Sequence, residues 1–462
     1  MALARSVSAP THGVDLGRIE ALMSREKARF LKEHPISGEL YTETKEHFIH
    51  GVPLHWMSQW PGPHPIFVER AKGTSLLDVD DNKYVDFCLG DSGAFFGHAN
   101  PVIANAIAEY VQGHGSTMML PSEDAVYLGK ELAGRFGLPT WQFATSATDA
   151  NRFAIRIARM VTGRNKILVF NGKYHGSVDE TQVELDSGNM VPQHGIHPNA
   201  TNFPETTVCI EFNDLGALES ALKAGDVACI LAEPVMTNIG MVPVDEGFHD
   251  EMRKLSKKYG TLLVIDETHT ICFGPSGYTG LHGLEPDFLV VGKVLAGGIP
   301  SAVYGMTSEI ATQLEEMTAG PGINHYGFGG TLTGNALTAR AIRATLENVA
   351  TQETYDRIFL LAERLRSEIS KVIEHNNLPW HVLRFGARVE YLYRPEPPKN
   401  GSEAAAARDD FIEEFIHLYA LNRGVLLTPF HNMALVSPAT STKDIDYYLE
   451  VFSECIEELT GQ

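Results

Sequence analysis

TLLVIDE (residues 261–267) and DFLVVGK (residues 287–293) are two apolar runs that each end in charged residues. Neither run alternates apolar with polar residues, and this pattern is typical of strands buried on both faces of a parallel sheet. Such sheets bind ligands at the carboxyl ends of their strands. The residues that end the two runs, Asp266 and Lys293, are therefore predicted to lie at a ligand-binding edge.

The same pattern extends to both sides of these runs. KILVF (166–170) and ACILAEPV (228–235) are further apolar runs, and segments such as 247–259 between the runs have helical character. Strands that alternate with helices indicate an α/β domain with a mainly parallel sheet between helices. We assign this large domain to residues 121–345.

The N-terminal region predicts two smaller pieces. Residues 1–65 are assigned to a helical arm followed by a segment rich in Pro, Trp and His, which excludes regular helix there. SLLDVDDNKYVDF (75–87) alternates around a turn signal and predicts a hairpin. It lies in residues 66–120, which lead into the large domain and contribute to a small one.

The C-terminal region predicts the rest of the small domain. A helical stretch at 336–374 is followed by HVLRFGARVEYLYR (381–394), by an insertion rich in Pro, Gly and Ala at 395–407, and by two more helical stretches. This order of elements is typical of an α+β domain, which we assign to residues 346–462.

The composition excludes several classes of protein. The 462 residues include 37 Lys and Arg against 58 Asp and Glu, and the net charge of −21 would repel nucleic acid and anionic membranes. No apolar stretch reaches the roughly 18 residues of a membrane span, and no signal-peptide run is found. The five cysteines form no CxxC pair. We expect a cytoplasmic globular protein with no nucleic-acid partner, no membrane partner and no metal.

Asp266 and Lys293 each have two interpretations. A buried carboxylate such as Asp266 can cap a helix or form a core ion pair, or it can face a heterocyclic nitrogen and keep it protonated. Lys293 is either a surface lysine or a desolvated amine that attacks carbonyl groups. Because both residues end strand-like runs of one sheet, together they favour a cofactor site.

Other strand ends supply further candidates. FATSATDANRFAIRIARM places Ser146, Ala147 and Thr148 at the start of an amphipathic helix, where they either cap the helix or bind an anion. FNGKYHG places an aromatic residue and a histidine after KILVF, and ACILAEP ends in an acid. These additional cofactor-binding candidates are Tyr174, His175 and Glu233.

Several of these pieces resemble one known family. TSATDANRFAIRIAR, FNGKYHG, AEPVMTNIG, VIDETHT, VVGKVLAGGIP and GGTLTGN are similar, in order and spacing, to class-III aminotransferases. The similarity is closest to the glutamate-1-semialdehyde aminomutase subgroup and covers most of the chain. It implies pyridoxal 5'-phosphate (PLP) as cofactor and the type I fold of PLP-dependent transferases, with a mainly parallel seven-stranded sheet between helices plus a small α+β domain.

The resemblance also implies roles for individual residues. Lys293 matches the lysine that holds PLP in a Schiff base, and Asp266 matches the partner of the pyridine nitrogen. Tyr174 matches the aromatic residue that covers the ring. Thr268 falls where the family usually has a valine beneath the ring, and His269 lies near the phenolic oxygen.

Two further matches concern the phosphate group. The turn formed by Ser146, Ala147 and Thr148 matches the phosphate-binding turn of the family. Thr331 in GGTLTGN matches a threonine that reaches the phosphate of the neighbouring subunit. The resemblance therefore implies a homodimer with shared active sites, and it leaves a tetramer open.

Substrate recognition departs from the family pattern. The segment GVPLHWMSQW (51–60) lacks the arginine that aminomutases have there, and LTPFHNMALVSP (427–438) lacks their acidic residue as well as the arginine of many ω-transaminases. Arg388 and Arg394 are candidates for binding a substrate carboxylate, with structural ion pairs as the alternative. Candidates for an apolar substrate pocket, with core packing as the alternative, are Trp56, Met57, Trp60, Phe95 and Phe96.

Three hypotheses for function follow. The first is a PLP-dependent transaminase that moves an amino group from an amine or amino acid to a keto acid or aldehyde, with Lys293 and Asp266 as catalytic residues. The second is an aminomutase, in which one substrate both donates and receives the amine. The third is a protein that binds PLP without turnover.

Overall fold

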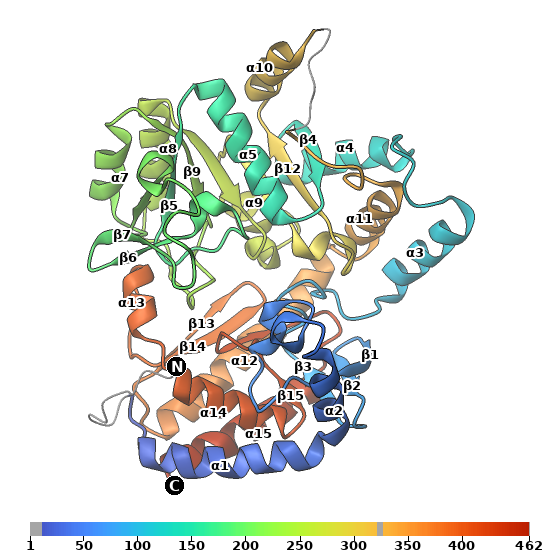
Figure 1. Ribbon diagram of the computed structural model, residues 1–462, viewed down its shortest axis with the longest axis vertical. Coiled ribbons are helices and arrows are strands. Elements are labelled where there is room, and N and C mark those ends of the chain that lie inside the picture. The colour runs from blue at the N-terminus through green and yellow to red at the C-terminus, as the bar shows by residue number, and fades with distance from the viewer. Residues whose placement is uncertain (1–11, 321–326, 462) are drawn as a thin grey trace.

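A seven-stranded sheet lies in the upper half of the molecule as Figure 1 shows it, with helices packed on both faces. The computed structural model describes residues 12–320 and 327–461. The strand order in the sheet is β4-β12-β11-β10-β9-β5-β8. In chain order these strands are β4 (Thr140–Ala144), β5 (Lys166–Phe170), β8 (Thr207–Ile210), β9 (Val227–Ala232), β10 (Leu262–Asp266), β11 (Phe288–Val291) and β12 (Ala302–Met306).

The directions of the strands confirm a mainly parallel sheet. β8, β5, β9, β10 and β11 run parallel to one another. β12 is antiparallel to both of its neighbours, β11 and β4. Only residues 292–301 join β11 to β12, and a parallel crossover needs a dozen or more residues. The start of β12 therefore lies at the same edge as the end of β11.

The helices form two layers because alternate residues of a strand point to opposite faces. On one face, Val264 and Val290 pack with residues of α5 (Ala147–Thr162) and α10 (Ser308–Thr318). On the other face, Ile265 and Leu289 belong to a larger cluster that includes, among others, residues of four helices of this half of the molecule. These are α4 (Asp124–Phe136), α7 (Leu215–Leu222), α8 (Phe248–Tyr259) and α11 (Ala336–Asn348). Additional helices in this region are α3 (Pro101–Gly113), α6 (Phe203–Thr206) and α9 (Gly277–His282).

The two ends of the chain come together in the lower half of Figure 1, where blue and red elements lie side by side. β15 (Val425–Leu426) pairs in parallel with β3 (Lys83–Asp86), and the sheet continues through β2 (Ser75–Asp78) to β1 (Val68–Lys72). α1 (Leu16–Glu33) packs on α14 (Asp410–Leu421). The remaining elements are α2 (Pro35–Thr44), α12 (Gln352–His375), β13 (His381–Phe385), β14 (Arg388–Leu392), α13 (Gly401–Ala406), β16 (Met433–Leu435) and α15 (Thr442–Thr460).

Most of the predicted elements are present. The hairpin predicted in 75–87 forms from β2 and β3. The stretch 336–374 is two helices rather than one, because the Thr351 side chain caps the start of α12 by accepting a hydrogen bond from Thr354 N. An unpredicted hairpin of β6 (Val183–Asp186) and β7 (Asn189–Pro192) follows β5. The domain boundaries at 65, 120 and 345 stay predictions.

The part of the chain that the structure describes has no helix with the length and apolar character of a membrane span.

Candidate functional site

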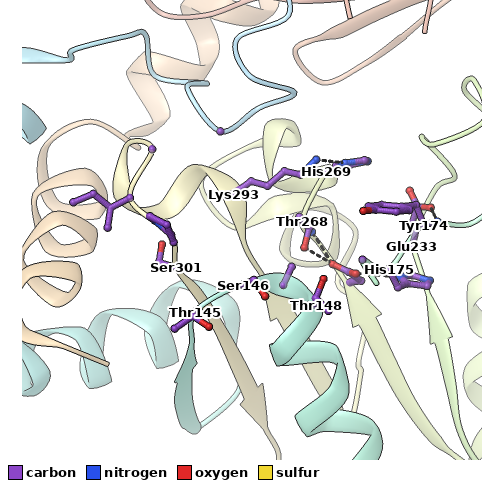
Figure 2. Close-up of a pocket in the computed structure, with 17 residues that line it drawn as sticks. Thr145, Ser146, Thr148, Tyr174, His175, Glu233, Thr268, His269, Lys293 and Ser301 are labelled. Atoms are coloured by element: carbon purple, nitrogen blue, oxygen red, sulfur yellow. Dashed lines mark hydrogen bonds and ion pairs between the residues drawn. The ribbon is translucent and has the colours of Figure 1, made fainter. Parts of the chain in front are cut away.

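The polar residues that end the strands surround one cavity of about 330 Å³ at the carboxyl edge of the sheet. Figure 2 shows Lys293 and His269 pointing toward one another, with Ser146 and Thr148 at the start of α5 below them. The ends of β4, β5, β9, β10 and β11 and the loops that follow them supply most of the walls. The predicted residues that line the cavity are Ser146, Ala147, Thr148, Tyr174, His175, Glu233, Asp266, Thr268, His269 and Lys293.

Asp266 is held in a dense set of hydrogen bonds at the end of β10. Its Oδ2 accepts from Asn151 Nδ2 at 2.7 Å and pairs with His175 Nδ1 at 2.9 Å. Its Oδ1 accepts from the backbone N–H of Thr268 at 3.0 Å and from the Thr268 hydroxyl at 2.5 Å. Burial opposes ionisation, but the hydrogen bonds from His175 and the other donors hold the pKa of Asp266 below its usual value. The site therefore presents a fixed carboxylate.

His175 and Asn151 both orient Asp266 through the same oxygen, Oδ2. Asn151 lies on α5, and His175 follows β5, so two separate elements fix one carboxylate. Nε2 of His175 is buried and has no hydrogen-bond partner among the described residues. Asn151 was not predicted from the sequence, because an asparagine inside an amphipathic helix gives no signal of a carboxylate opposite it.

Lys293 has an unusual backbone conformation. Its φ is +51°, in the left-handed region that non-glycine residues seldom adopt. The preceding Gly292 leaves no room for a side chain, since a Cβ there would lie 2.9 Å from the Cβ of Ala147. The backbone after β11 thus passes close to the start of α5, and this directs the Lys293 amine across the cavity.

The Lys293 amine has two partners. Nζ donates a short hydrogen bond to Asp91 Oδ2 and lies 2.7 Å from His269 Nε2. The charge of Lys293 contributes to an Asp91 pKa well below its usual value, although burial alone would raise it. Asp91 was not predicted from the sequence. It lies in CLGDSG, a loop without the strand-end pattern that identified the other candidates.

A chain of hydrogen bonds fixes the tautomer of His269. The Thr237 hydroxyl donates to Glu233 Oε2 at 2.8 Å and lies 2.9 Å from His269 Nδ1. Because the hydroxyl has one hydrogen, it accepts from His269 Nδ1–H, and Nε2 is left as an acceptor for Lys293. Burial and the nearby Lys293 lower the pKa of His269 to about 3, so the ring is neutral. Thr237 is buried and was not predicted.

The start of α5 has the features of an anion site. Ser146 caps the helix by accepting from Asp149 N at 3.2 Å, and the first-turn N–H groups of α5 face the cavity lined by Ala147 and Thr148. Gly176 has a φ of +76°, and a Cβ there would lie 1.9 Å from Thr148 Oγ1. Only glycine at position 176 therefore allows this turn to pack so closely against the start of the helix.

A second cavity of about 450 Å³ adjoins the first and shares Tyr174, His269 and Lys293 with it. Its walls are mainly apolar, and the Trp56 ring lies 6.3 Å from Tyr174 and 5.0 Å from Phe430, centroid to centroid. No arginine is among the described residues that line either cavity. The full lining consists of Leu54, Trp56, Met57, Trp60, Cys88, Gly90, Asp91, Tyr174, Asn238, His269, Lys293, Pro429 and Phe430.

Four of the predicted substrate residues lie elsewhere, which corrects the prediction. Phe95 and Phe96 are buried in the core, where both pack near Tyr355. Arg388 is fully buried behind Asp91, with its Nη2 donating to Ser92 Oγ at 3.0 Å. Arg394 forms an ion pair with Glu403 at 3.0 Å. The two phenylalanines therefore take part in core packing, and the two arginines form structural contacts, as the alternatives had it.

Thr331 lies apart from the other candidates. It lines a separate cavity with Thr117 and Gly330, in the loop before α11. Within one chain it therefore does not join Lys293. Its role across a subunit interface stays a prediction.

The groups in the first cavity match the chemistry of PLP. A protonated pyridine nitrogen requires an anionic partner such as Asp266, a phosphate requires free N–H groups such as those of α5, and an aldehyde requires an amine such as that of Lys293. His175, whose buried Nε2 has no protein partner among the described residues, also lines this cavity. All four groups converge on a space of about 330 Å³.

Comparisons with known proteins agree with this chemistry. The model of the family Aminotransferase class-III matches residues 56–456. The glutamate-1-semialdehyde 2,1-aminomutase of Persephonella marina is 31% identical over 92% of this chain and 99% of its own length.

Similar structures have been solved as well. A glutamate-1-semialdehyde-aminomutase from Pseudomonas aeruginosa PAO1 is 54% identical, with a TM-score of 0.95 over 97% of this chain and all of its own. A lysine-to-alanine variant of that enzyme, in complex with PMP, matches equally well. A β-phenylalanine aminotransferase from Variovorax paradoxus shares the fold at 23% identity, with a TM-score of 0.83 over 94% of this chain and 97% of its own.

Proposed function

This chain belongs to the class-III aminotransferase family of PLP-dependent enzymes, with their type I fold, and we propose that it moves an amino group within a single substrate, as an aminomutase does. The observation that carries the proposal is the similarity to proteins described as aminomutases, at 54% identity over 97% of the chain for the Pseudomonas enzyme. Lys293 lines both the cofactor cavity and the adjoining cavity, as amino transfer of either kind requires.

Each group of the first cavity has a part in this proposal. Bound PLP supplies an electron-withdrawing ring that stabilises negative charge on the carbon next to the transferred nitrogen. Asp266 keeps the proton on the ring nitrogen, and Tyr174 and Thr268 enclose the ring. The N–H groups at Ser146, Ala147 and Thr148 bind the phosphate.

Lys293 has two roles in the proposal. Its amine would hold the cofactor, and when released it would move a proton between the two carbon atoms on either side of the transferred nitrogen. Neutral His269 accepts a hydrogen bond from this amine through Nε2, and Thr237 and Glu233 fix the tautomer that allows it. The chain thus provides a neutral acceptor of fixed tautomer beside the proton-transferring amine.

A homodimer with shared active sites completes the proposal. Thr331 and Lys293 line different cavities within one chain, and this arrangement supports a role for Thr331 at the phosphate of the partner subunit.

Transamination between two substrates is the second candidate, and one observation favours it. The second cavity is mainly aromatic, and no arginine is among its described lining residues, whereas the family resemblance places an arginine near 51–60 in aminomutases. A cavity of this kind suits an apolar amine better than a substrate with a carboxylate.

One experiment separates the two candidates. Purified protein loaded with PLP is incubated with glutamate-1-semialdehyde and no other amino acceptor, with Lys293→Ala protein as the control. We expect isomerisation of the substrate by the wild-type protein alone. If amino transfer occurs only after a keto acid or aldehyde is added, the aminomutase proposal is wrong and transamination takes its place.

A further inference from the structure

Asp91 is a carboxylate in the wall of the second cavity that neither the strand-end pattern nor the family resemblance identified. It lies in the loop after β3, where Leu89, Gly90, Asp91 and Ser92 all have φ values between +48° and +73°. Four consecutive residues in the left-handed region cost free energy, and such loops persist only where surrounding contacts hold them. The loop therefore places Asp91 with little freedom.

Buried contacts hold this loop from below. The Asp86 carboxylate accepts hydrogen bonds from the backbone N–H groups of Cys88 and Leu89, both at 2.8 Å. Arg388, on β14, donates to Ser92 and has its Nη1 3.8 Å from Asp91 Oδ1. Arg388 is fully buried, so it anchors the loop without reaching the cavity.

The charges of the second cavity are few. Among its described lining residues, Asp91 is the one anion and Lys293 the one cation, since His269 is neutral. In the structure the Lys293 amine donates a hydrogen bond to Asp91 Oδ2. When Lys293 is held by the cofactor, it is no longer a free ammonium, so Asp91 Oδ2 loses its partner while Arg388 Nη1 stays 3.8 Å from the other oxygen, Oδ1. A half-buried carboxylate oxygen without a hydrogen-bond donor is unfavourable. A substrate ammonium can take the place that Lys293 leaves.

We propose that Asp91 binds the ammonium group of the incoming substrate, and that the site accordingly selects primary amines that have no carboxylate on the amine-bearing carbon, a class that includes glutamate-1-semialdehyde. A carboxylate on that carbon would lie close to Asp91 and be repelled, with no arginine on the described cavity wall to offset the repulsion. Trp56, Tyr174 and Phe430 line the space that receives the carbon chain of the amine. This inference rests on the proposed role of Lys293 as cofactor anchor.

Asp91→Asn removes the charge and little else. Asparagine adopts the left-handed backbone readily, so the loop can keep its conformation. Asp81→Asn is the matched control, because Asp81 also has a positive φ, of +66°, but is exposed in the turn between β2 and β3.

Three probes are compared on protein loaded with PLP. Phenylethylamine carries the ammonium, phenylalanine adds a carboxylate to the amine-bearing carbon, and phenylethanol replaces the ammonium with a neutral hydroxyl. The apparent dissociation constant of each amine is read from the change in cofactor absorbance, and that of phenylethanol from competition. For the amines, KM and kcat are obtained from the conversion of the cofactor itself, a half-reaction that needs no amino acceptor.

The wild type and the Asp81→Asn control are expected to bind phenylethylamine more tightly than phenylalanine. Asp91→Asn should weaken the binding of phenylethylamine roughly tenfold to a hundredfold, as expected for loss of a charged hydrogen bond. The change should appear mainly in KM. Phenylethanol should bind equally to all three proteins. Unchanged binding of phenylethylamine by Asp91→Asn, equal weakening of the amine and the alcohol, or preference of the wild type for phenylalanine would each overturn the proposal.

The attachment of PLP to Lys293 is checked separately. Borohydride reduction and peptide mapping show whether PLP is attached to Lys293 in wild-type and Asp91→Asn protein. Attachment in both, together with unchanged amine binding, refutes the role of Asp91 alone. Absence of attachment in the wild type refutes the proposed function, and the inference about Asp91 with it.

Discussion

At the scale of single residues, the site depends on contacts that determine which groups carry a proton. His269 is neutral because burial and Lys293 lower its pKa to about 3, and its tautomer follows from Thr237 and Glu233. Asp266 is ionised because His175, Asn151 and Thr268 all donate to it. The amine and the carboxylate of the proposed chemistry are thus set by neighbours that do not react.

Thr237→Val tests the hydrogen-bond chain. Valine has nearly the same shape but cannot accept from His269 Nδ1, so the tautomer with a free Nε2 loses its support. We expect kcat to fall roughly tenfold, as for loss of one buried hydrogen bond, with the PLP content unchanged. Equal activity of Thr237→Val and wild type across the pH range would show that His269 does not depend on Thr237.

The sequence identified the residues at strand ends and missed those that act on them. Asp266 and Lys293 end apolar runs, and this pattern is visible in one sequence. Asn151, Thr237 and Asp91 reach the site from a helix, a turn and a distant loop. Their positions depend on tertiary packing, which neither periodicity nor spacing encodes.

At the scale of elements, close contact between the turn after β5 and the start of α5 shapes the anion site. Gly176 has no Cβ and can lie against Thr148. The sequence predicted the amphipathic helix and its cap, because both follow from local patterns. It could not predict that another turn would close on that cap.

Gly176→Ala should distort the anion site. The new Cβ would lie 1.9 Å from Thr148 Oγ1, so the turn or the helix end must shift. Gly188→Ala is the matched control, since Gly188 has a similar φ of +81° but nothing within 4 Å of its Cβ position. We expect the affinity for PLP to fall roughly tenfold or more in Gly176→Ala, given the cost of overpacking, and to stay constant in Gly188→Ala. Equal PLP affinity in the two variants would place the phosphate elsewhere.

Glu413 on α14 predicts a pH dependence of stability. Burial raises its pKa to about 7, against the partial opposition of Arg408 and His431. Between pH 4.5 and 7 the folded protein keeps this proton while the unfolded chain releases it, so Glu413 lowers stability as the pH rises through this range.

Glu413→Gln removes this titration. The quantity compared is the difference in Tm, Glu413→Gln minus wild type. We expect this difference to be several degrees greater at about pH 8 than at about pH 5. Thermal unfolding at both pH values measures it. A difference between the two proteins that does not change with pH would show that Glu413 is ionised in the folded state.

At the scale of the whole molecule, the two ends of the chain build one structure. β15 joins the sheet of β1, β2 and β3, and α1 packs on α14. The sequence predicted the individual elements here, including the hairpin in 75–87 and the helices of residues 15–50. The pairing of β3 with β15 joins residues more than three hundred positions apart, and no local pattern specifies it.

The proposed sharing of active sites in a homodimer predicts complementation between two defective variants. Lys293→Ala lacks the proposed amine, and Thr331→Ala lacks the proposed contact to the partner's phosphate. In a mixed dimer one site contains both wild-type residues. After unfolding and reassembly of an equal mixture at limiting PLP, we expect activity of about a quarter of the wild-type level, as random pairing in a twofold dimer predicts. Activity no higher than the mean of the separate variants would place Thr331 outside the site.

Attachment of PLP to Lys293 is the central claim, and peptide mapping after borohydride reduction tests it most directly. Lys173 is the rival amine, because it is buried next to Tyr174 and burial lowers its pKa to about 8. We predict that the reduced cofactor is found on the peptide containing Lys293 and that Lys293→Ala protein carries none. Cofactor on Lys173, or retained by the Lys293→Ala protein after reduction, would contradict the account.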